Sequence, residues 1–209
     1  MIASQTTECS CKHIVSVSLG SSERNAKSTL QLKGQTFIIE RLGTDGNLQK
    51  ARQLLEELDG RVDALGLGGT DLYVYAGGRR YTFRESAKLI ENVKNTPVLD
   101  GSGLKNSLER ILINRLAADK IIDFQGKKVL MVCGVDRFGM AEALVANGAD
   151  VTFGDLIFGL NWDHPIKSLQ TLDSFAKLLA PLLTKLPVRW FYPMGAKQSQ
   201  RKPQHQGYF

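Results

Sequence analysis

The chain has 209 residues, of which 43% are hydrophobic and 23% are charged, and this composition is ordinary for a globular protein with a buried core. No stretch approaches the roughly 20 apolar residues that cross a bilayer, and the polar N-terminus lacks the apolar core of a secretory signal. We therefore predict a cytoplasmic protein without a membrane segment.

The net charge of +6 is unevenly distributed. The stretch 189–209 contains no acid, and its basic residues are Arg189, Lys197, Arg201 and Lys202. The rest of the chain is close to neutral, which argues against a nucleic-acid partner. The three cysteines lack the ligands that would complete a structural zinc site, so we predict no metal centre.

The first half alternates strand and helix patterns. Residues 13–19 alternate polar and apolar side chains, as a half-buried strand does. Two more strand patterns flank Lys33–Gly34, a tight-turn sequence, so we expect an antiparallel meander. The elements expected here are strands at 13–19, 29–32, 36–42, 62–67 and 97–99, a hairpin at 72–83 turning at Gly77–Gly78, and helices at 47–58, 84–95 and 104–116.

In the second half, the sequence predicts strands at 129–134, 150–153 and 188–192 and helices at 137–147 and 168–186. Strands that alternate with helices favour parallel crossovers. The predicted fold class is therefore α/β, with a mixed N-terminal sheet and helices followed by a Rossmann-like βαβ half. The expected organisation is a disordered leader (1–12), an N-terminal α/β domain on the substrate side (13–120), the dinucleotide-binding half (121–193) and a basic disordered tail (194–209).

The segment 127–155 carries much of a dinucleotide-binding fingerprint, in which glycines follow a strand and an acid comes about 20 residues later. Gly134 and Gly139 take the first and last glycine positions, and Asp155 lies 21 residues after Gly134, where it could accept hydrogen bonds from ribose hydroxyls. The middle position holds Asp136 instead of glycine, and its carboxylate would repel phosphate. Arg137 could restore a positive contact.

Two interpretations of this segment stay open. The first is a modified site that binds NAD, or NADP, through the residues just named; Asp155 favours NAD because a carboxylate repels a 2′-phosphate. The second is a structural βαβ unit in which Asp136 caps the helix.

A second glycine-rich turn between a strand and a helix lies at 96–110. A cation in the first helical turn is disfavoured by the helix dipole unless an anion lies nearby, and Lys105 takes that place. Asp100 could be its partner, in a ligand site or a purely structural loop. The turn at 66–71 places Asp71 after a strand, where α/β proteins bind ligands. The expected substrate-binding residues are Gly101, Ser102, Gly103, Asn106 and Asp71.

Five blocks resemble a bacterial family described as quinate 5-dehydrogenase-like. They are HIVSVSLGSS (13–22), FIIERLGTDG (37–46), VDALGLGGTDLY (62–73), LDGSGLKNSLER (99–110) and VDRFGMAEAL (135–144). The resemblance implies that a nicotinamide cofactor oxidises a small cyclic hydroxy acid. In quinate and shikimate dehydrogenases a lysine–aspartate pair handles the hydroxyl proton, and Lys105 with Asp100 or Asp71 could play that part here.

The family pattern also implies further strand and helix units after Tyr192, where this sequence continues instead into a polar, basic stretch at 195–209. The leading hypothesis is an NAD(P)-dependent oxidoreductase with Lys105 and Asp100 as catalytic residues. It would act on an acidic small molecule, as a monomer or a homo-oligomer. The alternative is a non-catalytic nucleotide- or metabolite-binding regulator, a shortened relative of the enzyme.

Overall fold

The computed structural model describes residues 11–190, which form a mixed α/β protein of two compact units. Of these residues, unit 1 holds 11–70, 86–100 and 188–190, and unit 2 holds 71–85 and 101–187. No helix among the described residues is long and apolar enough to span a membrane.

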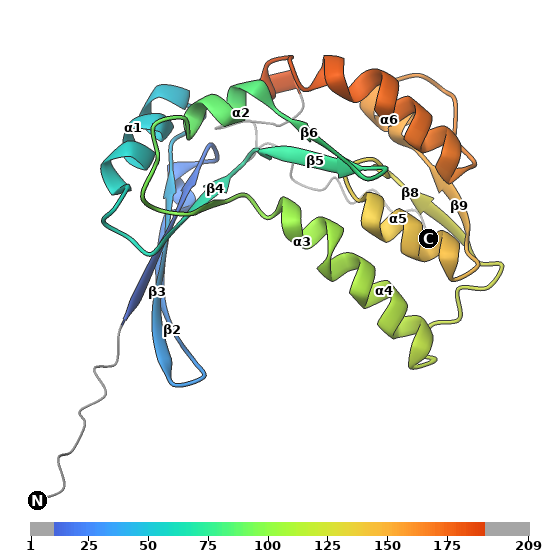
Figure 1. The fold of residues 1–209 in the computed structure, drawn as a ribbon, viewed down its shortest axis with the longest axis horizontal. Coiled ribbons are helices and arrows are strands. Elements are labelled where there is room, and N and C mark those ends of the chain that lie inside the picture. The colour runs from blue at the N-terminus through green and yellow to red at the C-terminus, as the bar shows by residue number, and fades with distance from the viewer. Residues whose placement is uncertain (1–10, 191–209) are drawn as a thin grey trace, which may run out of the picture. The chain divides into compact units, whose positions relative to one another are not determined.

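Unit 1 is built on a five-stranded sheet in the order β2-β3-β1-β4-β7 (Figure 1). β1 pairs in parallel with β3 and β4, β4 pairs in parallel with β7, and β2 pairs antiparallel with β3 at one edge. The strands are β1 (Lys12–Ser18), β2 (Ala26–Leu32), β3 (Gln35–Gly43), β4 (Ala64–Gly68) and β7 (Val98–Leu99).

The prediction of an antiparallel meander is therefore wrong for β1, which pairs in parallel with β3. Only β2 and β3 form a hairpin, turning at Lys33 and Gly34, which both have positive φ. A 3-10 turn at Ser22–Arg24 carries the chain out of β1, so that β3 returns beside it in the same direction. The alternating pattern predicts a strand but does not specify which strand is its neighbour.

The core of unit 1 lies between the sheet and α1 (Leu48–Leu58). Alternate side chains of β1 and β4, such as Val17 and Leu67, are buried on one face of the sheet. Ala51 and Leu55, on the apolar stripe of α1, are fully buried as well. Asn47 caps this helix, because its side chain accepts a hydrogen bond from the Lys50 amide at 2.9 Å.

Unit 2 contains the predicted βαβ unit. β8 (Lys128–Met131) pairs in parallel with β9 (Asp150–Phe153), and α5 (Phe138–Ala146) connects them. α6 (Leu169–Leu183) adds Leu172 and Ala176 to the core around Phe153. α3 (Ser102–Asn106) and α4 (Leu108–Ala118) together replace the single helix expected at 104–116, and both contact α5.

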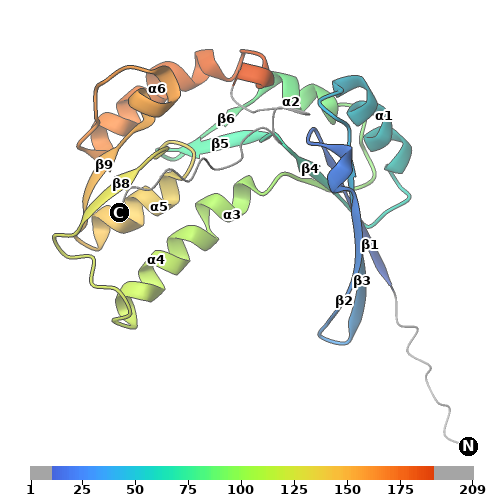
Figure 2. The same ribbon diagram turned by 180° about the vertical axis from the view of Figure 1, so that it is seen from behind.

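A β-hairpin from the first half of the chain completes unit 2. β5 (Tyr73–Ala76) and β6 (Arg79–Thr82) turn at Gly77 and Gly78, and both glycines have the positive φ that such a two-residue turn requires. In Figures 1 and 2 the hairpin lies between α6 on one side and α3 and α5 on the other. α2 (Arg84–Leu89) follows and is shorter than expected.

The compact units do not follow the expected boundary at residue 120. That position lies inside unit 2, because α3 and α4 pack against α5. The strand expected at 188–192 is instead a 3-10 turn over its described part, Val188–Trp190. The tail at 194–209 lies outside the described residues, as does the leader except for residues 11 and 12, and Lys12 begins β1.

Candidate functional site

The centre of the candidate site is an ion-pair cluster of three side chains in unit 2. The Nζ of Lys105, on α3, lies 2.8 Å from the Oδ2 of Asp71, and 2.9 and 3.1 Å from the two carboxylate oxygens of Asp136. The exposed side-chain fractions are 23% for Lys105, 9% for Asp71 and 27% for Asp136. The cluster is therefore half-shielded from water, and one cation faces two anions.

This arrangement keeps Lys105 protonated. Burial lowers the pKa of its ammonium group, but the hydrogen bonds and charges of Asp71 and Asp136 outweigh burial and raise it above the ordinary value. Lys105 is therefore a cation and a proton donor at neutral pH, and the two carboxylates are the proton acceptors of the cluster.

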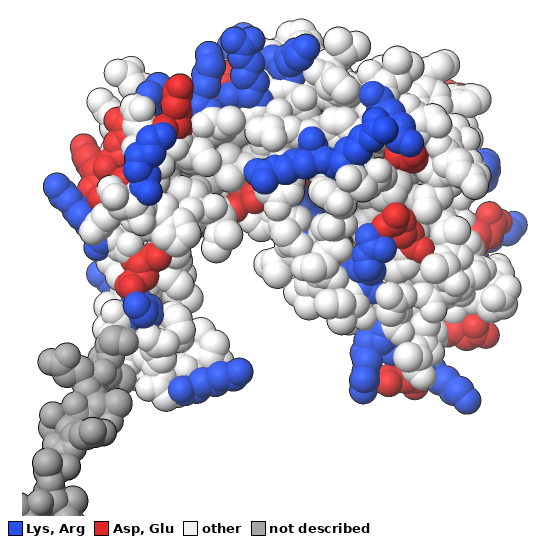
Figure 3. Space-filling model, viewed as in Figure 1, with Lys and Arg blue, Asp and Glu red and all other residues white. Residues whose placement is uncertain are grey.

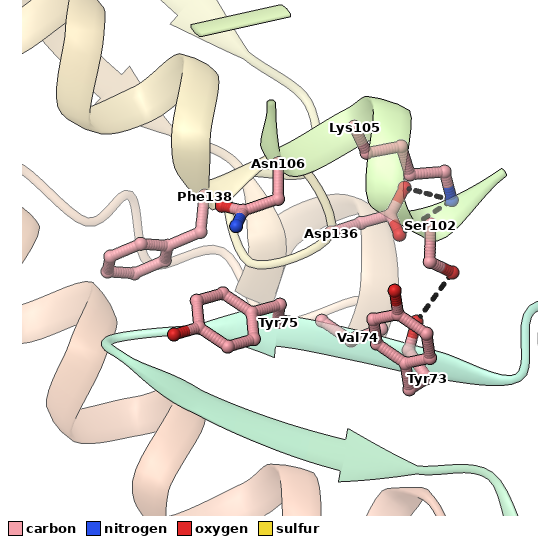
Figure 4. Close-up of a pocket in the computed structure, with 8 residues that line it drawn as sticks. All are labelled: Tyr73, Val74, Tyr75, Ser102, Lys105, Asn106, Asp136 and Phe138. Carbon is pink, nitrogen blue, oxygen red and sulfur yellow. Dashed lines mark hydrogen bonds and ion pairs between the residues drawn. The ribbon is translucent and has the colours of Figure 1, made fainter. Parts of the chain in front are cut away.

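The cluster borders a pocket between β5, α3 and the start of α5 (Figure 4). The pocket is shallow: about 200 Å³ of space lies among its lining atoms, open solvent included, and it encloses no cavity large enough for a water molecule. A ligand at this site would lie at the surface of unit 2 or would require the lining side chains to move. Its lining residues are Tyr73, Val74, Tyr75, Ser102, Lys105, Asn106, Asp136 and Phe138.

Local structure explains how the pocket walls are held. Gly101 precedes α3 with a φ of 86°, and the Ser102 hydroxyl donates a 2.8 Å hydrogen bond to the Tyr73 carbonyl, which fixes α3 against β5. Tyr73 and Tyr75 are two positions apart on β5, so their rings lie on the same face of the hairpin. Gly103 is exposed and does not line the pocket.

Asn106 contributes a polar atom without a partner. Its side-chain oxygen, Oδ1, is buried and accepts no hydrogen bond from any described residue. Figure 4 shows the Asn106 amide between Phe138 and Asp136, above the ring of Tyr75. A buried acceptor left unpaired costs about 1–3 kcal/mol, and this oxygen could accept from a ligand donor once the side chains that cover it move.

The structure brings together several residues that the sequence singled out for different roles. Lys105, Asp71, Ser102 and Asn106 meet at the pocket, and Asp136, expected at a cofactor, joins them as the second carboxylate beside Lys105. Asp100, expected as the partner of Lys105, belongs to unit 1. The carboxylates that contact Lys105 are Asp71 and Asp136.

The residues expected to contact a dinucleotide have internal partners. The Asp155 carboxylate accepts hydrogen bonds from the amides of Gly134 and Val135, both at 2.8 Å, so it holds together the loop that should cradle phosphate. Arg137 pairs with Glu109 of α4. Asp136 does not cap α5: the capping position is Arg137, without a side-chain hydrogen bond.

The two fingerprint glycines also have packing explanations. A Cβ on Gly134 would lie 2.6 Å from the Phe153 ring and 2.9 Å from Leu172, and a Cβ on Gly139 would lie 2.6 Å from the Asn106 carbonyl oxygen. Gly139 thus allows α5 to approach α3, rather than a strand as expected. With these partners, the residues of the β8–α5 loop do not fit the dinucleotide contacts that the fingerprint predicts.

The nearby Cys133 is an exposed free cysteine whose pKa is raised. Its pKa is raised to about 12, because the surrounding protein desolvates the thiolate, although the residue keeps some exposed surface, and because Asp155 and Asp136 repel its charge. At neutral pH the thiol is protonated, so nucleophilic chemistry by Cys133 is disfavoured.

Sequence reasoning missed the aromatic wall of the pocket. The hairpin at 72–83 was expected, and two tyrosines at positions i and i+2 of a strand share one face. This spacing was the available signal for Tyr73 and Tyr75. That Phe138 faces them depends on how α5 packs, which no local pattern reveals.

The fold and site define an α/β protein with a shallow pocket of aromatic and charged side chains on a Rossmann-like βαβ unit and an added hairpin. Residues 13–100 match the family model of the domain of unknown function DUF8753, and residues 103–209 match that of the domain of unknown function DUF8754. The second model covers more than half of the chain, which therefore belongs to the DUF8754 family. No curated protein matches the chain.

Proposed function

We propose that the protein binds a small hydroxylated metabolite in the Lys105 pocket. The observation that carries this proposal is the unpartnered buried oxygen of Asn106 beside the Lys105–Asp136 ion pair. A ligand hydroxyl can donate to Asn106 or Asp136 and accept from Lys105, so hydroxyl groups match both kinds of polar group in the pocket. The binding protein would act in the cytoplasm, as the sequence predicts.

A second candidate function is oxidation of a hydroxy acid with NAD or NADP at the same pocket. Lys105 between two carboxylates favours it, since such an oxidation removes the proton of the substrate hydroxyl as a hydride passes to nicotinamide. Asp71 or Asp136 would accept that proton in the oxidation, the same carboxylate would return it in the reverse reaction, and protonated Lys105 would hold the carboxylate in place. The internal hydrogen bonds of Asp155 favour binding without turnover.

Calorimetric titration with quinate tests the binding proposal, because quinate carries several hydroxyl groups on a small ring. We expect saturable binding that weakens at least about 10-fold in Asn106→Leu, where the acceptor is lost. Asn114→Leu is the matched control, because Asn114 lies on α4 outside the pocket and its amide contacts Asn147. No saturable binding by the folded wild type would overturn the proposal.

Titration with NADH and NADPH separates the two candidates. Binding of either cofactor, together with NADH or NADPH formation from quinate that Lys105→Met abolishes, would establish the oxidoreductase. Quinate binding without cofactor binding up to millimolar concentration would leave the binding function alone.

A further inference from the structure

An exposed apolar surface, the α3–α4 stripe, runs along two helices of unit 2. Four large aliphatic side chains form it: Leu104, Leu108, Ile111 and Leu112. All four are between 50% and 62% exposed. Residues three and four positions apart share one face of a helix, so these side chains lie next to one another. The α-helical hydrogen bonds from Ser107 to Gly103 and from Ile111 to Ser107 continue through the junction, so the stripe is one surface across both helices.

The opposite side of α3 and α4 packs against α5. Ile113 is buried in the core there, a Cβ on Gly139 would touch the Asn106 carbonyl oxygen, and Arg110 pairs with Glu142. The stripe therefore points away from the core of unit 2, and no residue of 11–190 buries it. Much of the surface over α3 is uncharged, as the white area of Figure 3 shows. Exposed apolar side chains that form one continuous surface are typical of an interaction site, whereas singly scattered ones are not.

The size of the stripe matches an interface between two proteins. A side chain exposed to this extent offers roughly 100 Å² of apolar surface. Ile121 and Ile122, which directly follow α4, are exposed as well. In an interface of standard size each partner buries about 800 Å², of which roughly 450 Å² is apolar. The stripe and the two isoleucines therefore supply the apolar part of one such interface.

We propose that the α3–α4 stripe pairs with the stripe of a second copy of this chain, and that the helices of the two copies lie antiparallel about a twofold axis at Leu108. Leu108 is the middle of the stripe, so this arrangement brings Leu104 of each copy beside the partner's Leu112. Arg115, which ends the stripe and pairs with its own Asp119, then lies opposite the glycine that precedes α3 and not opposite the partner's Arg115. Apolar side chains thus meet apolar side chains, and no like charges oppose one another.

Sedimentation velocity of the full chain tests the dimer. Leu108→Glu and Leu108→Lys each place two like charges together at the axis, so each should raise the dissociation constant of the dimer at least about 100-fold. An equal mixture of the two variants should form the dimer again, because glutamate then faces lysine across the axis. Misfolding of either variant would not give this recovery.

Leu178→Glu is the matched control, since Leu178 is also an exposed helical leucine of unit 2 but lies on α6. It should dimerise as the wild type does. Three results would each overturn the pairing: a wild type that stays monomeric at about 100 µM, a dimer that Leu108→Glu retains or Leu178→Glu loses, and a mixture that stays monomeric. None of them bears on the proposed metabolite binding, because no residue of the stripe lines the pocket.

Discussion

The ammonium group of Lys105 lies 2.8 Å from the carboxylate of Asp71, which precedes it by 34 residues and belongs to a different matched family region. Asp71 begins the segment that carries the β5–β6 hairpin, and Lys105 lies on α3. This ion pair therefore ties the hairpin to the rest of unit 2 at the pocket.

Replacing Lys105 with methionine should destabilise the protein. The change leaves Asp71 and Asp136 close together without a cation, and loss of a charged hydrogen-bonding partner costs about 1.5–3 kcal/mol. Urea unfolding measures the loss. Adding Asp136→Asn to Lys105→Met should recover part of it by removing one of the two repelling charges, and additive effects of the two changes would contradict the coupling.

The same cluster predicts a dependence of stability on alkaline pH. The folded pKa of Lys105 is raised, so its stabilisation is complete below the unfolded lysine pKa of about 10.4 and is lost as the pH rises through the folded value. Thermal unfolding above pH 10 should show a decline that is smaller in Lys105→Met. An identical decline in both proteins would contradict this prediction.

The Asp59 carboxylate should stabilise the protein at neutral pH, and this stabilisation should be lost in acid, whereas that of Lys105 is lost in alkali. Its pKa is lowered to about 2, chiefly by hydrogen bonds from the backbone amides of Lys94, Asn95 and Thr96. The contribution is present above the unfolded aspartate pKa of about 3.9 and is lost as the pH falls through about 2.

Asp59→Asn should therefore lower the melting temperature at neutral pH and flatten its change between about pH 4 and pH 2. Asp163→Asn is the matched control for loss of one carboxylate, because Asp163 is exposed and makes no hydrogen bond to a described residue; it should keep the wild-type melting temperature at neutral pH. If Asp59→Asn kept the wild-type profile, the amide contacts of Asp59 would not be what lowers its pKa.

Gly139→Ala tests the packing of α5 against α3. The added Cβ would lie 2.6 Å from the Asn106 carbonyl oxygen, and such overpacking costs about 1–3 kcal/mol. Gly159→Ala is the control, since nothing lies within 4 Å of its Cβ position. Chemical denaturation should separate the two variants, and equal stability would mean that the helices can move apart at no cost.

The thiol of Cys133 should react slowly with iodoacetamide. With a pKa of about 12 its thiolate fraction at pH 8 is about 1,000-fold below that of an ordinary cysteine. Mass spectrometry can follow its alkylation in native protein and in urea, where the rate should rise to that of glutathione. Rapid alkylation of the native protein would contradict the raised pKa.

The local patterns of the sequence predicted the helices and strands better than they predicted which strands pair with each other. The βαβ unit was predictable because apolar strands flank the apolar helix that begins at Phe138. The parallel pairing of β1 with β3 was not, since both orders of strands bury the same side chains of β1. The interruption of the helix at Ser107, between α3 and α4, likewise has no counterpart in the regular spacing of leucines.

Prediction of the site was limited by long-range contacts. Lys105 and Asp71 could be singled out, because both follow strands at glycine-rich turns. That Asp136 joins them depends on α5 approaching α3 closely at Gly139. An acidic residue such as Asp136 in a phosphate-binding loop either repels the phosphate or pairs with a cation that is distant in sequence. Only the tertiary structure distinguishes these cases.

Segments of the two units alternate along the chain, and this limits where the gene could recombine. A cut near residue 101 separates the two matched regions, yet it leaves the β5–β6 hairpin on the first piece and the helices it packs against on the second. Neither piece then encodes a whole unit 2, and the residues of the pocket are divided between them. Recombination at that point would exchange half of a binding site, so the two regions must evolve as one heritable segment if the pocket is used.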